Sequence, residues 1–445
     1  MTLPEGKPRE VMGWAVYCWA YHGFVTTVAS VLLGPYLTSL AQAEVGENGL
    51  VFSSHLLSTV TAKAYFFDCL SLSVLMQVFL LPLLGAIADY TSLKKPLLFT
   101  FSTIGAVATC ALYFVGAGIG FRAAGGLFAL ANLAFGASVV LCNAFLPEIV
   151  VPEDRDRVSS FGAALGYLGG GILLAVNLVF MGIAPRLGIS SSQAVRLCFL
   201  SAGVWWIIFS IPSAMSLKSQ PRSGAPVTPA RLLQLGASQL AGMFRRLRGR
   251  PQTLRFLFAY LLYNDGVQTV IGVAAVFFEQ ELFVARGLPA NQTFLLANFL
   301  MVQFVGFAGA LLFARLAAWI STKRALLLSL VTFCGVIVYA YGFLQTTRDA
   351  FGMSVVVALV LGGSQALSRS LFSRMIPAGD EAAFFAIYEI SGSGTSWIGP
   401  LIFALAVAAT NSYRDALLSL IALFAVGSVL LALTRVETAF QEAKG

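Results

Sequence analysis

Two adjacent polar residues stand deep inside a long apolar segment. Asn264 and Asp265 lie about ten residues into the segment 254–281, which is about 15 Å of helix and therefore near the middle of a bilayer. Polar groups at that depth are costly and usually face a cavity or a partner. Asp265 could load and release a proton or bind a substrate amine. A structural carboxylate paired to a base is the alternative.

An imidazole and an aromatic patch lie at a similar depth in the first apolar segment, 11–40. A neutral His22 could bind substrate or relay a proton, and a structural hydrogen bond to another helix is the alternative. Tyr17 belongs to the aromatic patch on this segment. Part of that patch could line a cavity, and part could form an interfacial belt.

Two opposite charges lie about seven residues from the same predicted end of two later segments, Arg369 in 350–376 and Glu389 in 382–408. Arg369 could bind a substrate carboxylate or pair with Asp265 or Glu389. With Glu389 it could form a gate salt bridge when that side of the protein closes. The alternative for Arg369 is a side chain that extends to the membrane surface.

A short polar turn separates two apolar runs that are each long enough to span a bilayer. It contains Gly85, Asp89, Lys94 and Lys95 in the pattern G-x-x-x-D-x-x-x-x-K-K. The glycine allows close helix approach, the acid can accept hydrogen bonds at a helix end, and the lysines hold the turn at the inner surface. The pattern resembles the loop between helices 2 and 3 of the major facilitator superfamily of transporters. A plain basic inner loop is the alternative.

The elements that carry these residues are membrane helices. The chain is 58% hydrophobic and only 11% charged, which excludes a soluble domain of this length. We therefore expect an all-α polytopic membrane protein, and we attribute the formal charge of +8 to basic loops and not to a nucleic-acid partner. Twelve apolar segments are predicted at 11–40, 64–88, 96–118, 123–147, 158–183, 193–216, 254–281, 292–318, 323–344, 350–376, 382–408 and 413–434.

The lysines and arginines indicate the orientation of these helices. Most of the 28 basic residues fall in alternate connections on the side that holds both termini. Inner loops carry the excess of positive charge, so both termini are predicted to be cytoplasmic.

The chain is predicted to divide into two six-helix bundles, 1–216 and 254–445, joined by a basic linker, 217–253. The linker could bind anionic lipid headgroups at the inner surface or be a plain connection. Related patterns at equivalent places in the two halves indicate duplication, with an axis along the membrane normal and a central cavity formed by helices 1, 4, 7 and 10. The matching positions are Tyr17, Gly23 and Thr26 with Tyr260, Gly266 and Thr269; Gly85, Asp89, Lys94 and Lys95 with Ala314, Ala318, Lys323 and Arg324; and Pro152 and Gly169 with Pro377 and Gly394.

Neither a metal nor a cofactor is expected. The six cysteines lie in or beside apolar runs with no C-x-x-C pair, and the chain has only two histidines. The glycine clusters lack the strand and the Lys-Ser/Thr of a phosphate loop, so we interpret them as sites of close helix packing. A membrane enzyme is the least favoured class because no nucleophile–base pair or metal cluster stands out.

Four stretches resemble one branch of the major facilitator superfamily, the vacuole-effluxer-like branch linked in fungi to autophagy. The resemblance implies a twelve-helix transporter and, for fungal members, export of amino acids such as leucine from the vacuole. The family usually has an acid where this chain has Cys18, and if that acid binds a substrate amine or a proton, this chain has changed that function. The stretches are 13–20 (GWAVYCWA), 84–89 (LGAIAD), 143–147 (NAFLP) with 157–162 (RVSSFG), and 384–389 (FFAIYE) with 399–400 (GP).

The sequence as a whole predicts a monomeric secondary transporter that moves a small solute by alternating access. Amino acids, exported, are the solute class that the resemblance implies, and the depth of Asp265 indicates coupling to protons. The alternatives are a drug or metabolite efflux transporter and a non-transporting scaffold or receptor with the same fold. The expected location is the cell membrane in a bacterium or the vacuolar membrane in a eukaryote.

Overall fold

The computed structural model is helical almost throughout. Within the described residues, the β-contacts amount to an isolated antiparallel bridge between Leu50 and Thr61. The described residues are 7–46, 49–52, 60–62, 65–116, 120–218, 242, 245–288, 292–393, 398–410 and 412–444.

Six membrane-length helical segments make up the N-terminal half. The first is 38 residues long and has a π-helical middle that begins directly after Gly23. The elements are α1 (Pro8–Gly23), η1 (Phe24–Leu32), α2 (Leu33–Val45), α3 (Tyr65–Tyr90), α4 (Lys94–Ala111), η2 (Leu112–Phe114), α5 (Phe121–Asn143), α6 (Leu146–Ile149), η3 (Pro152–Asp154), α7 (Arg155–Ile183), η4 (Ala184–Leu187) and α8 (Ser191–Ser216).

The C-terminal half contributes five further segments that are long and apolar enough to span a membrane. The predicted span 382–408 differs, because it consists of two shorter helices, α14 and α15, and residues 394–397 between them lie outside the described part. The elements are α10 (Pro251–Leu282), η5 (Val284–Arg286), α11 (Gln292–Ile320), α12 (Thr322–Phe343), α13 (Thr347–Ser373), α14 (Glu381–Ser393), α15 (Ile398–Thr410), α16 (Tyr413–Ser419), α17 (Ile421–Leu433) and α18 (Val436–Lys444).

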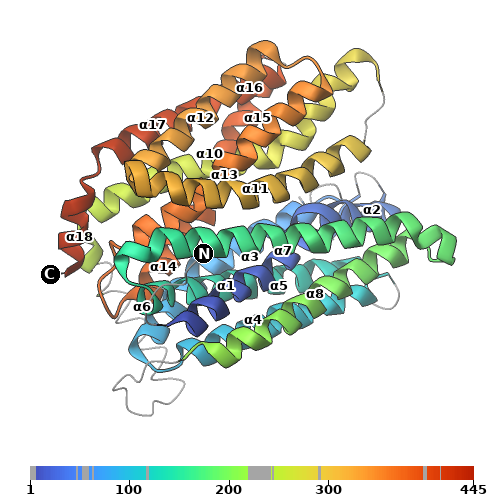
Figure 1. The fold of residues 1–445 in the computed structure, drawn as a ribbon. Coiled ribbons are helices and arrows are strands. Elements are labelled where there is room, and N and C mark those ends of the chain that lie inside the picture. The colour runs from blue at the N-terminus through green and yellow to red at the C-terminus, as the bar shows by residue number, and fades with distance from the viewer. Residues whose placement is uncertain are drawn as a thin grey trace.

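The two halves repeat the same packing pattern. In the first half α1 packs on α8, α3 on α5, and α4 on α5 and α8; in the second half α10 packs on α17, α11 on α13, and α12 on α13 and α17. Across the interface α3 packs on α14 and α11 packs on α7, which are again equivalent pairs. Figure 1 shows the halves as a blue-to-green layer and a yellow-to-red layer. The boundaries of the two predicted bundles stay a prediction, and the predicted linker (217–253) lies mostly outside the described residues.

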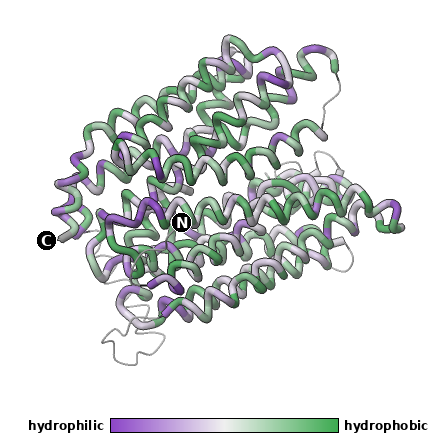
Figure 2. The backbone as a smooth tube through the Cα atoms, in the orientation of Figure 1, coloured by the Kyte–Doolittle hydropathy of each residue, from purple (hydrophilic) through white to green (hydrophobic). Residues whose placement is uncertain are grey.

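Both described chain ends lie at one end of the molecule, which we call the termini end. Lys7 Nζ donates to the Glu148 carbonyl at 3.1 Å, beside the α3–α4 turn, and Arg250 Nε donates to the Glu442 carbonyl at 2.8 Å. Along the helices, large apolar side chains face outward, and Trp319 is 82% exposed. Figure 2 shows hydrophobic residues along the helices and hydrophilic stretches toward their ends. An apolar exterior of this extent is that of a multi-pass membrane protein.

Candidate functional site

A cavity of ≈ 270 Å³ lies between the two halves. Its walls come from α1 with η1, α5 and α7 in the first half and from α10, α13 and α14 in the second. The predicted helices 1, 4, 7 and 10 therefore do line it, together with the fifth and the eleventh. The polar and aromatic residues that face it are Tyr21, His22, Phe135, Asn143, Tyr167, Tyr260, Asn264, Gln268, Gln365, Arg369, Tyr388 and Glu389.

Arg369 is the cation of this cavity, and it reaches across the interface. Its Nε and Nη2 donate to the Ser159 hydroxyl and carbonyl at 2.9 and 2.8 Å, and its Nη1 donates to Asn143 Oδ1 at 3.4 Å. The guanidinium also stands 5.0 Å from the ring centroid of Trp14. The side chain is 9% exposed, so it does not extend to the membrane surface. Buried with neutral acceptors, this charge is suited to receive a carboxylate.

Glu389 lines the same cavity from α14. The predicted gate salt bridge between Arg369 and Glu389 is wrong for this conformation: in the described residues the two do not pair, because the guanidinium is turned to Ser159. The predicted alternative pairing of Arg369 with Asp265 is also absent from the described structure. What the structure brings together is one positive and one negative side chain on the wall of a single cavity.

His22 faces the cavity as predicted. Its Nδ1 lies 2.8 Å from the Cys18 carbonyl, which can only accept, so Nδ1 carries the proton and Nε2 remains an acceptor. The ring stacks on Tyr21, with centroids 4.7 Å apart. A Cβ at Gly166 on α7 would overlap the imidazole, so this glycine makes room for it. The glycine clusters thus serve close packing, as expected.

Tyr17 does not reach the cavity. It is fully buried inside the N-terminal half, 6.2 Å from the ring of Phe99 on α4, and its hydroxyl has no partner among the described residues. The prediction that it lines the pathway is therefore wrong in this conformation. Its repeat partner Tyr260 does line the cavity.

Asn264 and Asp265 point in different directions, as successive residues of a helix must. Asn264 lines the cavity and donates from Nδ2 to the Gly392 carbonyl at 2.8 Å. Asp265 is 1% exposed and lies behind the wall, where Oδ2 accepts from the Gly399 amide at 2.6 Å. It thus caps the N-terminus of α15, an end that favours negative charge. Its Oδ1 is buried with no partner in the described structure.

The predicted gate motif joins the two halves at the termini end. Both carboxylate oxygens of Asp89 accept backbone hydrogen bonds from the start of α14, from Ala382 at 2.9 Å and Ala383 at 2.7 Å. Gly85, one turn earlier, permits this contact, because a Cβ there would stand 2.6 Å from the Ala382 carbonyl oxygen. An acid from the first half therefore caps a helix of the second half.

Lys94 completes this cluster. Its Nζ lies 2.6 Å from Glu148, 3.6 Å from Asp89 and 3.8 Å from Glu381, and all four side chains are at least nine-tenths buried. Lys95 does not take part: it is half-buried and makes no ion pair in the described structure. Lys94 therefore belongs to the cluster between the halves, and the gate role of both lysines stays a prediction.

A second cross-half cluster was not predicted. Asp156 Oδ2 accepts from the Thr322 hydroxyl at 2.6 Å and pairs with Arg374 Nη2 at 2.9 Å. Arg155 Nη1 donates to the Ser373 carbonyl at 2.7 Å. From the sequence, Arg155 and Arg374 indicate only the orientation of the helices. The sequence signal for this cluster was the pair of prolines at equivalent places in the two halves. Pro152 precedes Arg155 in the connection between helices 4 and 5, and Pro377 follows Arg374 in the connection between helices 10 and 11.

All polar contacts between the halves in the described structure lie at the cavity or on its termini side. The contact farthest from the termini end is a hydrogen bond from the Tyr167 hydroxyl to Gln365 Oε1 at 3.1 Å. The termini end is therefore the closed end of the cavity in this conformation.

The arrangement of two helical halves about a central cavity matches solved transporter structures. One is the proton:xylose symporter XylE bound to 6-bromo-6-deoxy-D-glucose, with a TM-score of 0.66 at 12% identity over 95% of this chain and 94% of that one. Another is the human organic anion transporter MFSD10 (TETRAN), with a TM-score of 0.66 at 13% identity over 95% of this chain and 99% of that one. The fold is that of the major facilitator superfamily (MFS).

The family follows from sequence. A family model described as "Vacuole effluxer Atg22 like" matches residues 6–444, and the chain belongs to that family of MFS-type transporters. The uncharacterized MFS-type transporter YxiO of Bacillus subtilis (strain 168) is 29% identical over 438 residues, with 97% of this chain and 96% of the relative covered. Autophagy-related protein 22-2 of Aspergillus clavatus is 28% identical over 427 residues, 75% of this chain and 68% of the relative. The resemblance stated from the sequence is confirmed.

Proposed function

We propose that this transporter carries zwitterionic amino acids through the central cavity by alternating access and exports them, with protons as the coupling ion. The observation that carries the proposal is the placement of Arg369 and Glu389 on the wall of one cavity. An amino acid has the complementary pair of charges, a carboxylate and an ammonium group. The name of the family, vacuole effluxer, supports the direction.

Each end of the substrate has a counterpart on this wall. The planar guanidinium of Arg369 matches a carboxylate in two-point geometry, and Glu389 offers a negative charge to the ammonium group. The rings of Tyr21, Phe135 and Tyr260 provide surfaces for an apolar side chain. A neutral sugar has no charged group that could pair with Arg369 or Glu389.

Binding at Arg369 would also couple the substrate to the gate. The guanidinium donates to Ser159 and Asn143 across the interface. A substrate carboxylate is a stronger acceptor than a hydroxyl or an amide, so it would draw the guanidinium away from the first half. That exchange would loosen the closed end once the cavity is occupied, which is the coupling that alternating access requires.

Asp265 is the proposed proton carrier. Its unpartnered Oδ1 is enclosed by protein, and its neighbour Asn264 is on the cavity wall. Protonation of Asp265 would weaken its cap on α15. The proton state would thereby be linked to the position of a helix next to the cavity.

The charge pattern supports a proposal for the orientation of the protein in its membrane. We place the termini end in the cytoplasm because the basic connections gather there, and we expect a monomer in contact with anionic lipids through the basic linker. The host membrane would be a bacterial cell membrane or a eukaryotic vacuolar membrane.

The test is uptake of a mixed amino-acid pool into proteoliposomes with and without an imposed pH gradient. Wild type would accumulate amino acids only with the gradient, and Asp265→Asn would lose the gradient dependence. Asp68→Asn is the matched control, because Asp68 is an exposed acid on α3 and would behave as wild type. Accumulation in Asp265→Asn equal to wild type would make Asp265 structural. No accumulation by folded wild type would overturn the substrate class and direct the search to other metabolites, and then to a scaffold role.

A further inference from the structure

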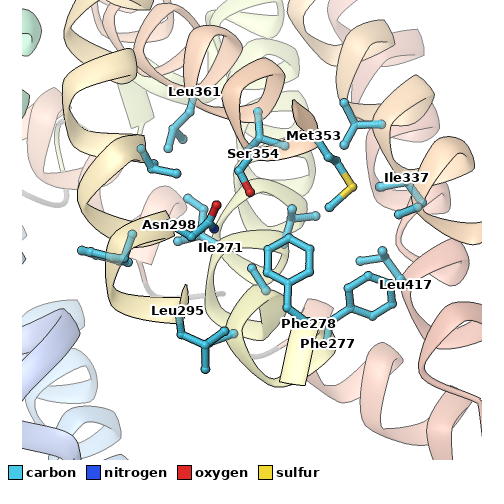
Figure 3. Close-up of a pocket in the computed structure, with 18 residues that line it drawn as sticks. Ile271, Phe277, Phe278, Leu295, Asn298, Ile337, Met353, Ser354, Leu361 and Leu417 are labelled. Atoms are coloured by element: carbon cyan, nitrogen blue, oxygen red, sulfur yellow. The ribbon is translucent and has the colours of Figure 1, made fainter. Parts of the chain in front are cut away.

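A second pocket lies within the C-terminal half and shares no lining residue with the central cavity. It has a volume of ≈ 120 Å³ and is enclosed by α10, α11, α12, α13 and α16. Figure 3 shows its wall, which is mainly aromatic and aliphatic, with Phe278, Ile337, Met353 and Leu417 among the side chains around it. No charged residue lines it, so an ion would have no counterpart there.

Two polar side chains interrupt this apolar wall. Asn298 is 8% exposed, and its Oδ1 is buried with no hydrogen-bond partner in the described structure. Ser354, from α13, is 5% exposed and stands on the same wall. In Figure 3 the polar ends of both side chains are turned into the pocket. A buried amide oxygen without a partner is destabilising, and packing alone would be better served by leucine at this position.

We propose that this pocket binds a small uncharged molecule that has an apolar body and one hydroxyl group, an alcohol or phenol of about the size of benzyl alcohol. A cavity of about 150 Å³ lined by apolar side chains is known to hold benzene, so the space here suits one ring or a short chain. The hydroxyl donates to Asn298 Oδ1 and accepts from a neighbouring donor such as Ser354. A lipid acyl chain has no donor and would leave the amide oxygen unsatisfied.

This site is separate from the proposed transport of amino acids and does not depend on it. Two of its helices, α10 and α13, also carry Asn264 and Arg369 to the central cavity. The ligand therefore binds between helices that the transport cycle must move, although its binding can be measured without transport.

The experiment is photolabelling of the purified full-length transporter in lipid nanodiscs with a short aliphatic alcohol whose chain carries a diazirine and which is no larger than benzyl alcohol. The matched reagent is the same diazirine without the hydroxyl. Mass spectrometry of the peptides should place label from the alcohol on α10, α11 or α13 around Phe278 and Met353, and excess unlabelled benzyl alcohol should remove it. The hydroxyl-free reagent should label these peptides about tenfold less at equal concentration, as expected for the loss of one buried hydrogen bond.

Three variants decide the outcome. Asn298→Leu should lower labelling by the alcohol about tenfold and leave labelling by the hydroxyl-free reagent unchanged, whereas Asn177→Leu, a buried asparagine of the other half, should change neither. Ala274→Leu fills the pocket without altering Asn298 and should abolish labelling by both reagents, which keeps the test decisive where Asn298→Leu does not fold. Labelling that does not saturate, or that is equal for the two reagents, would overturn the proposal.

Discussion

The cap that Asp89 places on α14 predicts what its loss will do. Asp89 is 8% exposed, and its two oxygens accept the amides of Ala382 and Ala383 at 2.9 and 2.7 Å. Asp89→Asn keeps the shape of the side chain but leaves one acceptor oxygen in place of two. It also removes the negative charge from the N-terminus of the helix, where the helix dipole favours an anion.

The magnitude follows from these contacts. A hydrogen bond to a charged group contributes about 1.5–3 kcal/mol, and the dipole term adds up to about 2 kcal/mol in partly buried geometry. Part of the loss is offset, because Glu148 and Glu381 also surround Lys94 and their repulsion with Asp89 is relieved. A net cost of about 2 kcal/mol to the closed termini end changes the closed-to-open ratio about 30-fold.

The assay is a distance measurement between spin labels across the termini end. Labels at Ser92, in the α3–α4 turn, and Ala378, before α14, attach to exposed positions of opposite halves. The native cysteines are replaced first. In wild type without solute the distribution should show the short, closed distance, and Asp89→Asn should add a longer one. Lys95→Gln is the matched control, since Lys95 makes no ion pair in the described structure, and its distribution should equal that of wild type.

A distance distribution for Asp89→Asn that matches wild type would contradict this prediction. The cap would then contribute nothing to closure. If Lys95→Gln also showed the longer distance, with a population similar to that in Asp89→Asn, then any charge change in the turn would open the termini end. The effect would then not be specific to Asp89.

Three further changes have defined outcomes. Gly85→Ala places a Cβ 2.6 Å from the Ala382 carbonyl oxygen and should open the same spin-label distance, while circular dichroism shows helix content unchanged. Arg369→Gln removes the cation that receives the carboxylate and should raise the half-saturating amino-acid concentration in uptake about a hundredfold; a change below threefold would contradict its role. Gly166→Ala forces the His22 ring from its place and should weaken amino-acid binding by calorimetry, with unchanged affinity as the contrary result.

The helices could be predicted because a long run of apolar residues is the direct sequence signature of a helix that crosses a lipid bilayer. Eleven of the twelve predicted segments appear as single membrane-length helical segments in the described structure. The exception, 382–408, is divided into α14 and α15. The acids that cap the two parts, Asp89 and Asp265, come from other helices. The segment does contain helix-breaking residues, Gly392, Gly394, Gly399 and Pro400, which are a local signal for such an interruption.

The site was predicted in part because depth and residue type are readable in a sequence, whereas the direction of a side chain is not. His22, Asn264, Arg369 and Glu389 do line one cavity. Asp265 lies behind the wall of that cavity, because adjacent residues differ by about 100° around a helix.

The charge clusters at the gate could not be predicted from spacing alone. Glu148 and Glu381 meet Lys94 from separate elements, and such a meeting depends on how the two halves pack.

The assignment of the cavity to zwitterionic amino acids is tested most directly by competition in the same proteoliposomes. Unlabelled leucine and unlabelled leucinamide are compared as competitors of the Arg369-dependent uptake of labelled leucine. Leucinamide keeps the ammonium group and the side chain but has no carboxylate for Arg369. The account predicts that leucine competes for uptake at least about tenfold better than leucinamide, and that Arg369→Gln loses this preference. Equal competition by the two compounds in wild type would contradict the assignment of the cavity to zwitterionic amino acids.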